Sequence, residues 1–76
     1  MNWERLEGHW KRLAGRAQEQ WGKLTNDDIA VIASHRDQLT GKVQERYGVA
    51  RDEAERQVAR WEHSAVEAWI PVNERT

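Results

Sequence analysis

The stretch "LAGRAQEQWG" occupies residues 13–22, and a related stretch, "LTGKVQERYG", occupies residues 39–48. The two stretches align without a gap at an offset of 26 residues, with identical Leu, Gly, Gln, Glu and final Gly. Self-similarity at a fixed offset indicates an internal duplication. Because each copy has an apolar face that it cannot bury alone, we expect the two copies to pack against each other.

The first predicted helix leads into the first copy and ends with it. Asn2 is a suitable N-cap, and Gly22 suits the left-handed position that follows a helix. Apolar residues recur every three or four positions between them, which places these residues on one helical face. They are Trp3, Leu6, Trp10, Leu13, Ala17 and Trp21.

Two further helices follow. Thr25 and Asp28 resemble a capping box, which predicts a short helix over residues 26–33. Ser34 is then expected to cap a helix over residues 35–47. Each copy thus reads as a helix, a glycine, a short linker and a second helix.

A fourth helix is expected to begin near Arg51 and to extend toward Trp69, before Pro71 stops it. The sequence therefore predicts an all-α fold, in which four helices form two packed α-hairpins with an approximate internal duplication. Residues 1–70 would form one domain, and residues 71–76 would form a flexible C-terminal tail.

Three glycines lie inside the predicted helices rather than at their ends. Gly8 and Gly15 share one face of the first helix, and Gly41 is the equivalent of Gly15 in the second copy. An interior glycine costs a helix about 1 kcal/mol relative to alanine. These glycines indicate a close approach by a neighbouring helix, a helix of low stability, or a packing groove for a partner.

The composition argues against several classes of protein. The chain contains no Cys, so it has neither a disulfide nor a thiolate metal site. No apolar run approaches the roughly 20 residues of a membrane span, and the N-terminus lacks the apolar stretch of a signal peptide. A net charge of −1 does not match a strongly basic nucleic-acid-binding domain. We therefore expect a cytoplasmic protein.

No group of side chains in the sequence indicates catalysis. His9, His35 and His63 have neither a Cys nor a second His at the spacing of a metal site. Ser34 and Ser64 do not lie in a nucleophile motif. The sequence predicts no enzyme activity, no metal site and no cofactor.

A basic stripe borders the tryptophan face of the first predicted helix. Arg5, His9, Arg12 and Arg16 fall on one flank of that helix. The stripe is either a solvated charged face or an anion-binding site for phosphates or lipid headgroups. The chain is expected to be a monomer, or a weak homodimer through the apolar positions of residues 59–70.

Several motifs resemble those of the CsbD-like family of small bacterial general stress response proteins. They include "WGKLT" at residues 21–25, "RDQL" at residues 36–39 and "QERYG" at residues 44–48, and the resemblance covers residues 2–62. It implies a small cytoplasmic bacterial protein that is induced by stress, with two packed α-hairpins in a SAM-domain-like topology. The family has no assigned molecular activity, so the resemblance transfers no functional residue.

The sequence thus predicts a non-enzymatic, hydrophilic protein of the general or osmotic stress response. One alternative is a weak nucleic-acid- or membrane-surface-binding module that uses the basic flank of the first helix. Another is an adaptor that meets a protein partner. The chain departs from the family pattern at Ala50, where a polar cap is expected, and after residue 62. The extent of the last helix toward Trp69 is therefore left open.

Overall fold

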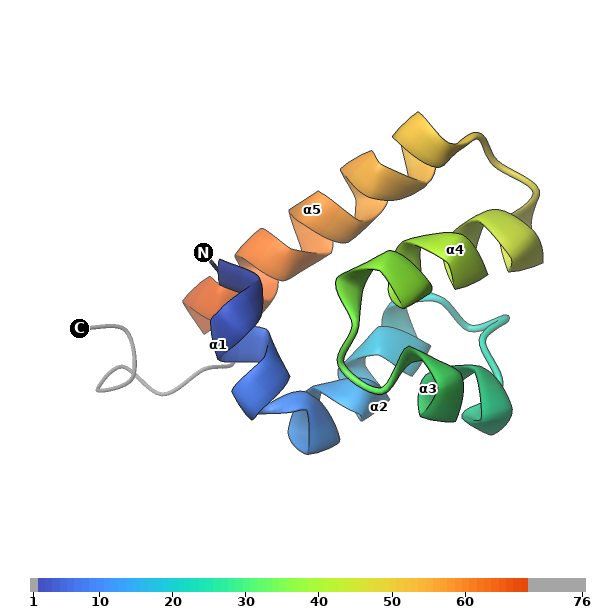
Figure 1. Cartoon of the computed structure of the whole chain (residues 1–76). Helices are drawn as coiled ribbons and strands as arrows, with labels where there is room; N and C mark the ends of the chain where they lie inside the picture. The colour runs from blue at the N-terminus through green and yellow to red at the C-terminus, as the bar shows by residue number, and fades with distance from the viewer. Residues whose placement is uncertain (1, 69–76) are drawn as a thin grey trace.

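The computed structural model describes residues 2–68, and every regular element among them is an α-helix (Figure 1). The predicted all-α class is confirmed, with five helices in place of four. The longest helix, α5, packs on both α4 and α1, and α3 packs on α4. The predicted tail, 71–76, and Trp69 lie outside the described residues. The helices are α1 (Asn2–Gly8), α2 (Trp10–Gln20), α3 (Asn26–Ile32), α4 (Arg36–Tyr47) and α5 (Arg51–Ala68).

The prediction of one continuous first helix is wrong, because the helix breaks at His9. This residue has φ −117° and ψ 18°, and its amide N–H donates to the carbonyl of Leu6, only three residues back, at 3.0 Å. Gly8 immediately precedes the break, and glycine weakens a helix. The break lets α1 pack against α5, where Leu6 becomes fully buried.

The predicted capping box at the start of α3 is confirmed. The amide of Asp28 donates to Thr25 Oγ1 at 3.1 Å, and the amide of Thr25 donates to Asp28 Oδ2 at 3.0 Å. The end of the second copy is also as expected. Gly48 follows α4 with φ 65°, in the left-handed region that favours glycine.

Two other predicted helix ends are wrong. Gly22 does not adopt a positive φ. The N-cap of α4 is His35 rather than Ser34, and its side chain makes no capping hydrogen bond. Ala33 and Ser34 instead form a left-handed turn, with φ 43° and 74°, which costs a non-glycine residue about 1–2 kcal/mol. Trp3 Nε1 donates to the carbonyl oxygen of Ser34 at 2.7 Å and so ties this turn to α1.

The offset of 26 residues relates two units of the structure, α1–α2 and α3–α4, whereas the sequence analysis placed the second copy in the last two predicted helices. Each unit has a short helix, a break and a longer helix, and His9 and His35 are the equivalent N-caps of the longer helices. Helix α5 lies outside these two units. The two-hairpin arrangement with a SAM-domain-like topology stays a prediction. Three pairs of equivalent positions are fully buried: Leu6 and Ile32, Leu13 and Leu39, and Ala17 and Val43.

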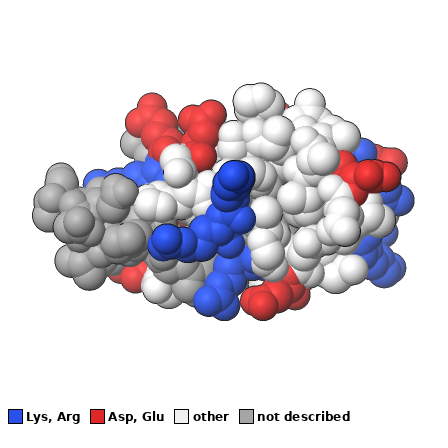
Figure 2. Space-filling model, turned by 90° about the horizontal axis from the view of Figure 1, so that it is seen from below, with Lys and Arg blue, Asp and Glu red and all other residues white. Residues whose placement is uncertain are grey.

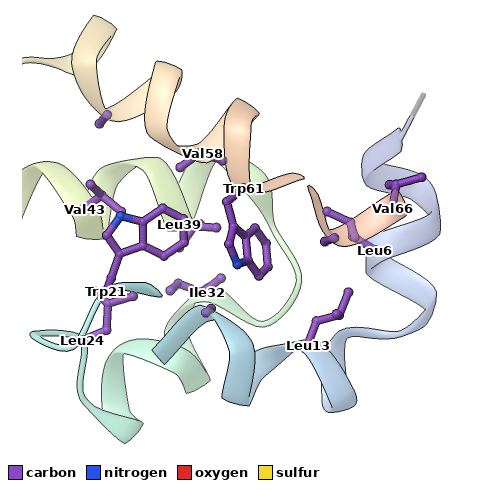
Figure 3. Close-up of a cluster of buried hydrophobic side chains, with 13 residues drawn as sticks. Leu6, Leu13, Trp21, Leu24, Ile32, Leu39, Val43, Val58, Trp61 and Val66 are labelled. Atoms are coloured by element: carbon purple, nitrogen blue, oxygen red, sulfur yellow. The ribbon is translucent and has the colours of Figure 1, made fainter. Parts of the chain in front are cut away.

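Tryptophan rings join α1, α2 and α5 in the core. The Trp61 ring centroid lies 5.5 Å from that of Trp21 and 6.4 Å from that of Trp3. Trp21 and Trp61 are buried and lie between the aliphatic side chains of the surrounding helices (Figure 3). Trp10 extends the cluster toward the surface, with its ring centroid 6.1 Å from that of Trp3. Large rings bury much area per residue, which suits a small core.

Candidate functional site

The structure places the four residues of the predicted basic stripe on both sides of the break between α1 and α2. Arg5 and His9 are half-buried, whereas Arg12 and Arg16 are exposed on α2. Lysine and arginine side chains gather near the middle of the face seen in Figure 2, which is the lower side of Figure 1, where α2 lies. Carboxylates lie toward the margins of that view. The face therefore offers positive charge to an anionic partner.

The basic face is a surface of exposed side chains rather than a shaped cavity. Arg16 Nη1 lies 3.5 Å from Glu19 Oε1, and both side chains are at least half exposed. An exposed ion pair of this kind contributes little to stability, so Arg16 can exchange its partner for another anion. Lys11 is also exposed on α2, although the sequence interpretation omitted it. The sequence could have indicated Lys11, because this residue directly precedes Arg12 of the predicted stripe.

The glycines of the predicted packing groove face open space. A Cβ atom added to Gly8, Gly15 or Gly41 would meet no atom within 4 Å, so no neighbouring helix of the fold approaches them. Gly8 and Gly15 are exposed and Gly41 is half-buried. The explanation by close helix packing within the fold is therefore wrong. A groove for a partner stays a prediction.

Because Gly15 has a helical backbone and open space around it, replacing Gly15 with alanine should stabilise the protein by about 1 kcal/mol. The change would be measured as a higher urea midpoint with an unchanged slope. The control is Gly48→Ala, which should destabilise the protein because φ is 65° there. A lower midpoint for Gly15→Ala would show that this position needs glycine for packing.

Asp28 is a charged group that the fold buries, with 2% of its surface exposed. Arg46 donates to it twice, from Nε at 2.8 Å and from Nη2 at 2.9 Å, and Lys42 Nζ lies 3.5 Å from Oδ1. The hydrogen bonds from Arg46, and then that from the Thr25 amide, hold the pKa of Asp28 well below its usual range. The same contacts raise the pKa of Arg46.

These contacts occupy both carboxylate oxygens of Asp28, so the cluster joins α3 to α4 and has a structural role. The sequence analysis found only the capping contact of Asp28. It missed Arg46, because no local pattern links two residues 18 positions apart.

The remaining predicted candidates lie apart. His35, His63 and Ser64 are exposed; His35 precedes α4, whereas His63 and Ser64 are neighbours on α5. Within residues 2–68, no three His, Cys, Asp or Glu residues are grouped so that they could hold a metal ion. No helix in this part of the chain combines the length and the apolar character needed to cross a membrane.

The predicted surface for a weak homodimer is only partly exposed. Within residues 59–70, Val66 is buried beside Leu6 of α1 (Figure 3). Ala59 is exposed, and Ile70 lies outside the described residues. Helix α1 therefore covers part of the apolar surface through which the sequence predicted a weak homodimer.

Comparison with known proteins identifies the family. The family model described as CsbD-like matches residues 4–56. The UPF0337 protein YjbJ of Escherichia coli strain K12 is 53% identical over 62 residues, which are 82% of this chain and 90% of that protein. YjbJ of Salmonella typhimurium strain LT2 is 55% identical over 62 residues, or 82% of this chain and 89% of its own. The UPF0337 protein NE2439 of Nitrosomonas europaea is 46% identical over 72 residues, or 95% and 77% of the two chains. These matches confirm the resemblance read from the motifs, and the chain belongs to the CsbD-like family.

Proposed function

We propose that this protein is a non-enzymatic, hydrophilic component of the bacterial general or osmotic stress response and acts in the cytoplasm. The observation that carries the proposal is the family match over residues 4–56. The resemblance to this family implies induction by stress. The relatives that match are bacterial proteins, which agrees with a bacterial stress role.

The surface suits a protein that accumulates to a high concentration. The mean hydropathy is −1.01, and charged residues make up 33% of the chain. Among the described residues, Val31 is the large hydrophobic residue that is exposed. Exposed apolar patches promote association, and the part of the surface formed by residues 2–68 carries no such patch around this valine.

The stress role is tested in the native bacterium. The amount of the protein should rise after an osmotic upshift, and a strain without the gene should survive the upshift less well. Survival should return in proportion to the amount of protein supplied from a plasmid. An unchanged amount after osmotic, heat and stationary-phase stress would contradict the proposal.

A second candidate function is weak binding of nucleic acid, and the gathering of basic side chains in Figure 2 favours it. Arg5, Arg12 and Arg16 would contact phosphates, and His9 lies between Arg5 and Arg12 in the same stripe. Binding that depends on phosphate contacts weakens steeply as salt increases. This dependence distinguishes the basic face from an apolar surface.

Replacing Arg5, Arg12 and Arg16 together with Gln should remove the binding of short duplex DNA at low salt. If each side chain contacts one phosphate, the slope of log affinity against log salt should fall by about 3. Amide NMR spectra at low and moderate salt would measure both quantities.

The matched control replaces Lys23, Arg51 and Arg56 with Gln and removes the same formal charge from other elements. The control should keep most of the binding. Equal losses in the two triple variants would show that net charge alone attracts the DNA. Retained binding in the first variant would eliminate the basic face as the site.

A further inference from the structure

A polar pocket lies between the C-terminal end of α2 and the middle of α5. Its volume is about 340 Å³. This volume falls within the range of small-molecule sites. The pocket is separate from the basic face and has no part in the stress role proposed above. Its lining residues are Gln20, Glu53, Gln57, Arg60, Trp61 and Ser64.

One wall of the pocket is held in place by hydrogen bonds within the fold. Trp21 Nε1 donates to Gln57 Oε1 at 3.0 Å, and Gln57 Nε2 donates to Glu53 Oε2 at 3.0 Å. Arg56 Nη2 donates to the other carboxylate oxygen of Glu53 at 2.7 Å. Because these groups are already ordered, a ligand would not bear the entropic cost of fixing them.

The carboxyl group of Glu53 carries its charge at neutral pH. Its hydrogen bonds with Gln57 and then Arg56 lower the pKa of Glu53 from its usual range. Each carboxylate oxygen has more than one acceptor position, so both can still accept a bond from a ligand. The fixed wall is therefore an anionic acceptor.

The opposite end of the pocket is cationic. Arg60 follows Glu53 by seven residues, so the two lie on one face of α5, about 10 Å apart along the helix axis. Arg60 is exposed, and its positive charge also contributes to lowering the pKa of Glu53. Arg56 also bonds to Glu53 but does not line the pocket. The lining therefore presents one carboxylate and one guanidinium, which favours a ligand whose positive and negative groups are separate.

We propose that this pocket binds a free α-amino acid as its zwitterion. The ligand carboxylate accepts hydrogen bonds from Arg60, and the ligand ammonium donates to Glu53. An apolar ligand side chain contacts the edge of the Trp61 indole that the pocket reaches. The Ser64 hydroxyl and the Gln20 carboxamide, both exposed at the rim, supply further hydrogen bonds.

The test uses the full chain and three ligands that differ by one charged group. These are L-valine, isobutylamine, which lacks the carboxylate, and isovalerate, which lacks the ammonium. Valine should give saturable shifts at the amides of Gln57, Arg60 and Ser64 and at the indole N–H of Trp61, with a Kd on the order of 1 mM. Each single-charge ligand should bind about tenfold more weakly or not at all, because it can make only one of the two charged contacts.

Two variants complete the test. Arg60→Gln and Glu53→Gln should each weaken valine binding about tenfold. Arg51→Gln changes another exposed arginine of α5 outside the pocket and should leave binding unchanged. The comparison of the three ligands uses the wild-type protein, so it remains a valid test even if Glu53→Gln disturbs the fold. Absence of saturable shifts with valine, equal binding of the three ligands, or an equal loss in Arg51→Gln would overturn the proposal.

Discussion

Replacing Trp61 with alanine should lower the free energy of unfolding by about 3–5 kcal/mol. Trp61 is 4% exposed, and its ring contacts those of Trp3 on α1 and Trp21 after α2. Its removal leaves a cavity where three parts of the chain meet. A domain of this size is stable by roughly 0.05–0.15 kcal/mol per residue, so this single change should remove a large part of its free energy of unfolding.

The measurement is urea unfolding followed by far-UV circular dichroism, with Trp10→Ala as the control. Trp10 is half-buried at the edge of the cluster and contacts the Trp3 ring. Trp10→Ala should lower the free energy of unfolding by about 1–2 kcal/mol, because the variant loses one ring contact and part of the buried area. Equal effects for the two variants would show that Trp61 is not the centre of the core.

Asp28→Asn should be the most destabilising change among the charged side chains. Asparagine keeps the shape of the side chain, but it leaves Arg46 and Lys42 beside a buried group that no longer carries the opposite charge. We expect a large fall in the urea midpoint near neutral pH. Glu55→Gln is the control, because the pair of Glu55 with Arg51 is exposed on α5 and its loss should hardly move the midpoint.

The same variant should change how the protein responds to acid. The pKa of Asp28 is lower in the folded state than the value of about 3.9 for an unperturbed carboxyl, so the unfolded state binds more protons as pH falls. The stabilisation is complete above about pH 4 and is lost progressively below it. Asp28→Asn should therefore lose less stability than the wild type between about pH 7 and about pH 3. An equal loss of stability in the variant and in the wild type would show that other carboxyls, Glu53 among them, account for the acid sensitivity.

Local sequence patterns predicted the helical class and several helix ends correctly. The capping box of Thr25 and Asp28 and the left-handed Gly48 depend on residues within one turn, so the sequence alone indicates them. The break at His9 could not be predicted in this way. The apolar stripe continues across it from Leu6 to Leu13, and the contact of α1 with α5 accompanies the bend.

The same distinction between local and tertiary contacts applies to the candidate sites. The arginines of the basic face were grouped by helical spacing, and the structure places them on both sides of the break at His9. The Asp28–Arg46 pair and the polar pocket join residues of different helices, such as Trp21 and Gln57, which only the tertiary structure brings together. The open space around Gly15 is likewise a property of the assembled helices.

The contact between α1 and α5 has a consequence for synthesis of the protein on the ribosome. Leu6 is made early, whereas Val66, which lies beside it in Figure 3, is made near the end of α5. Until α5 leaves the exit tunnel, the apolar face of α1 lacks its contacts with Val66 and with the Trp61 ring. We therefore expect α1, although it is translated before α5, to complete its packing only after α5 has emerged from the ribosome.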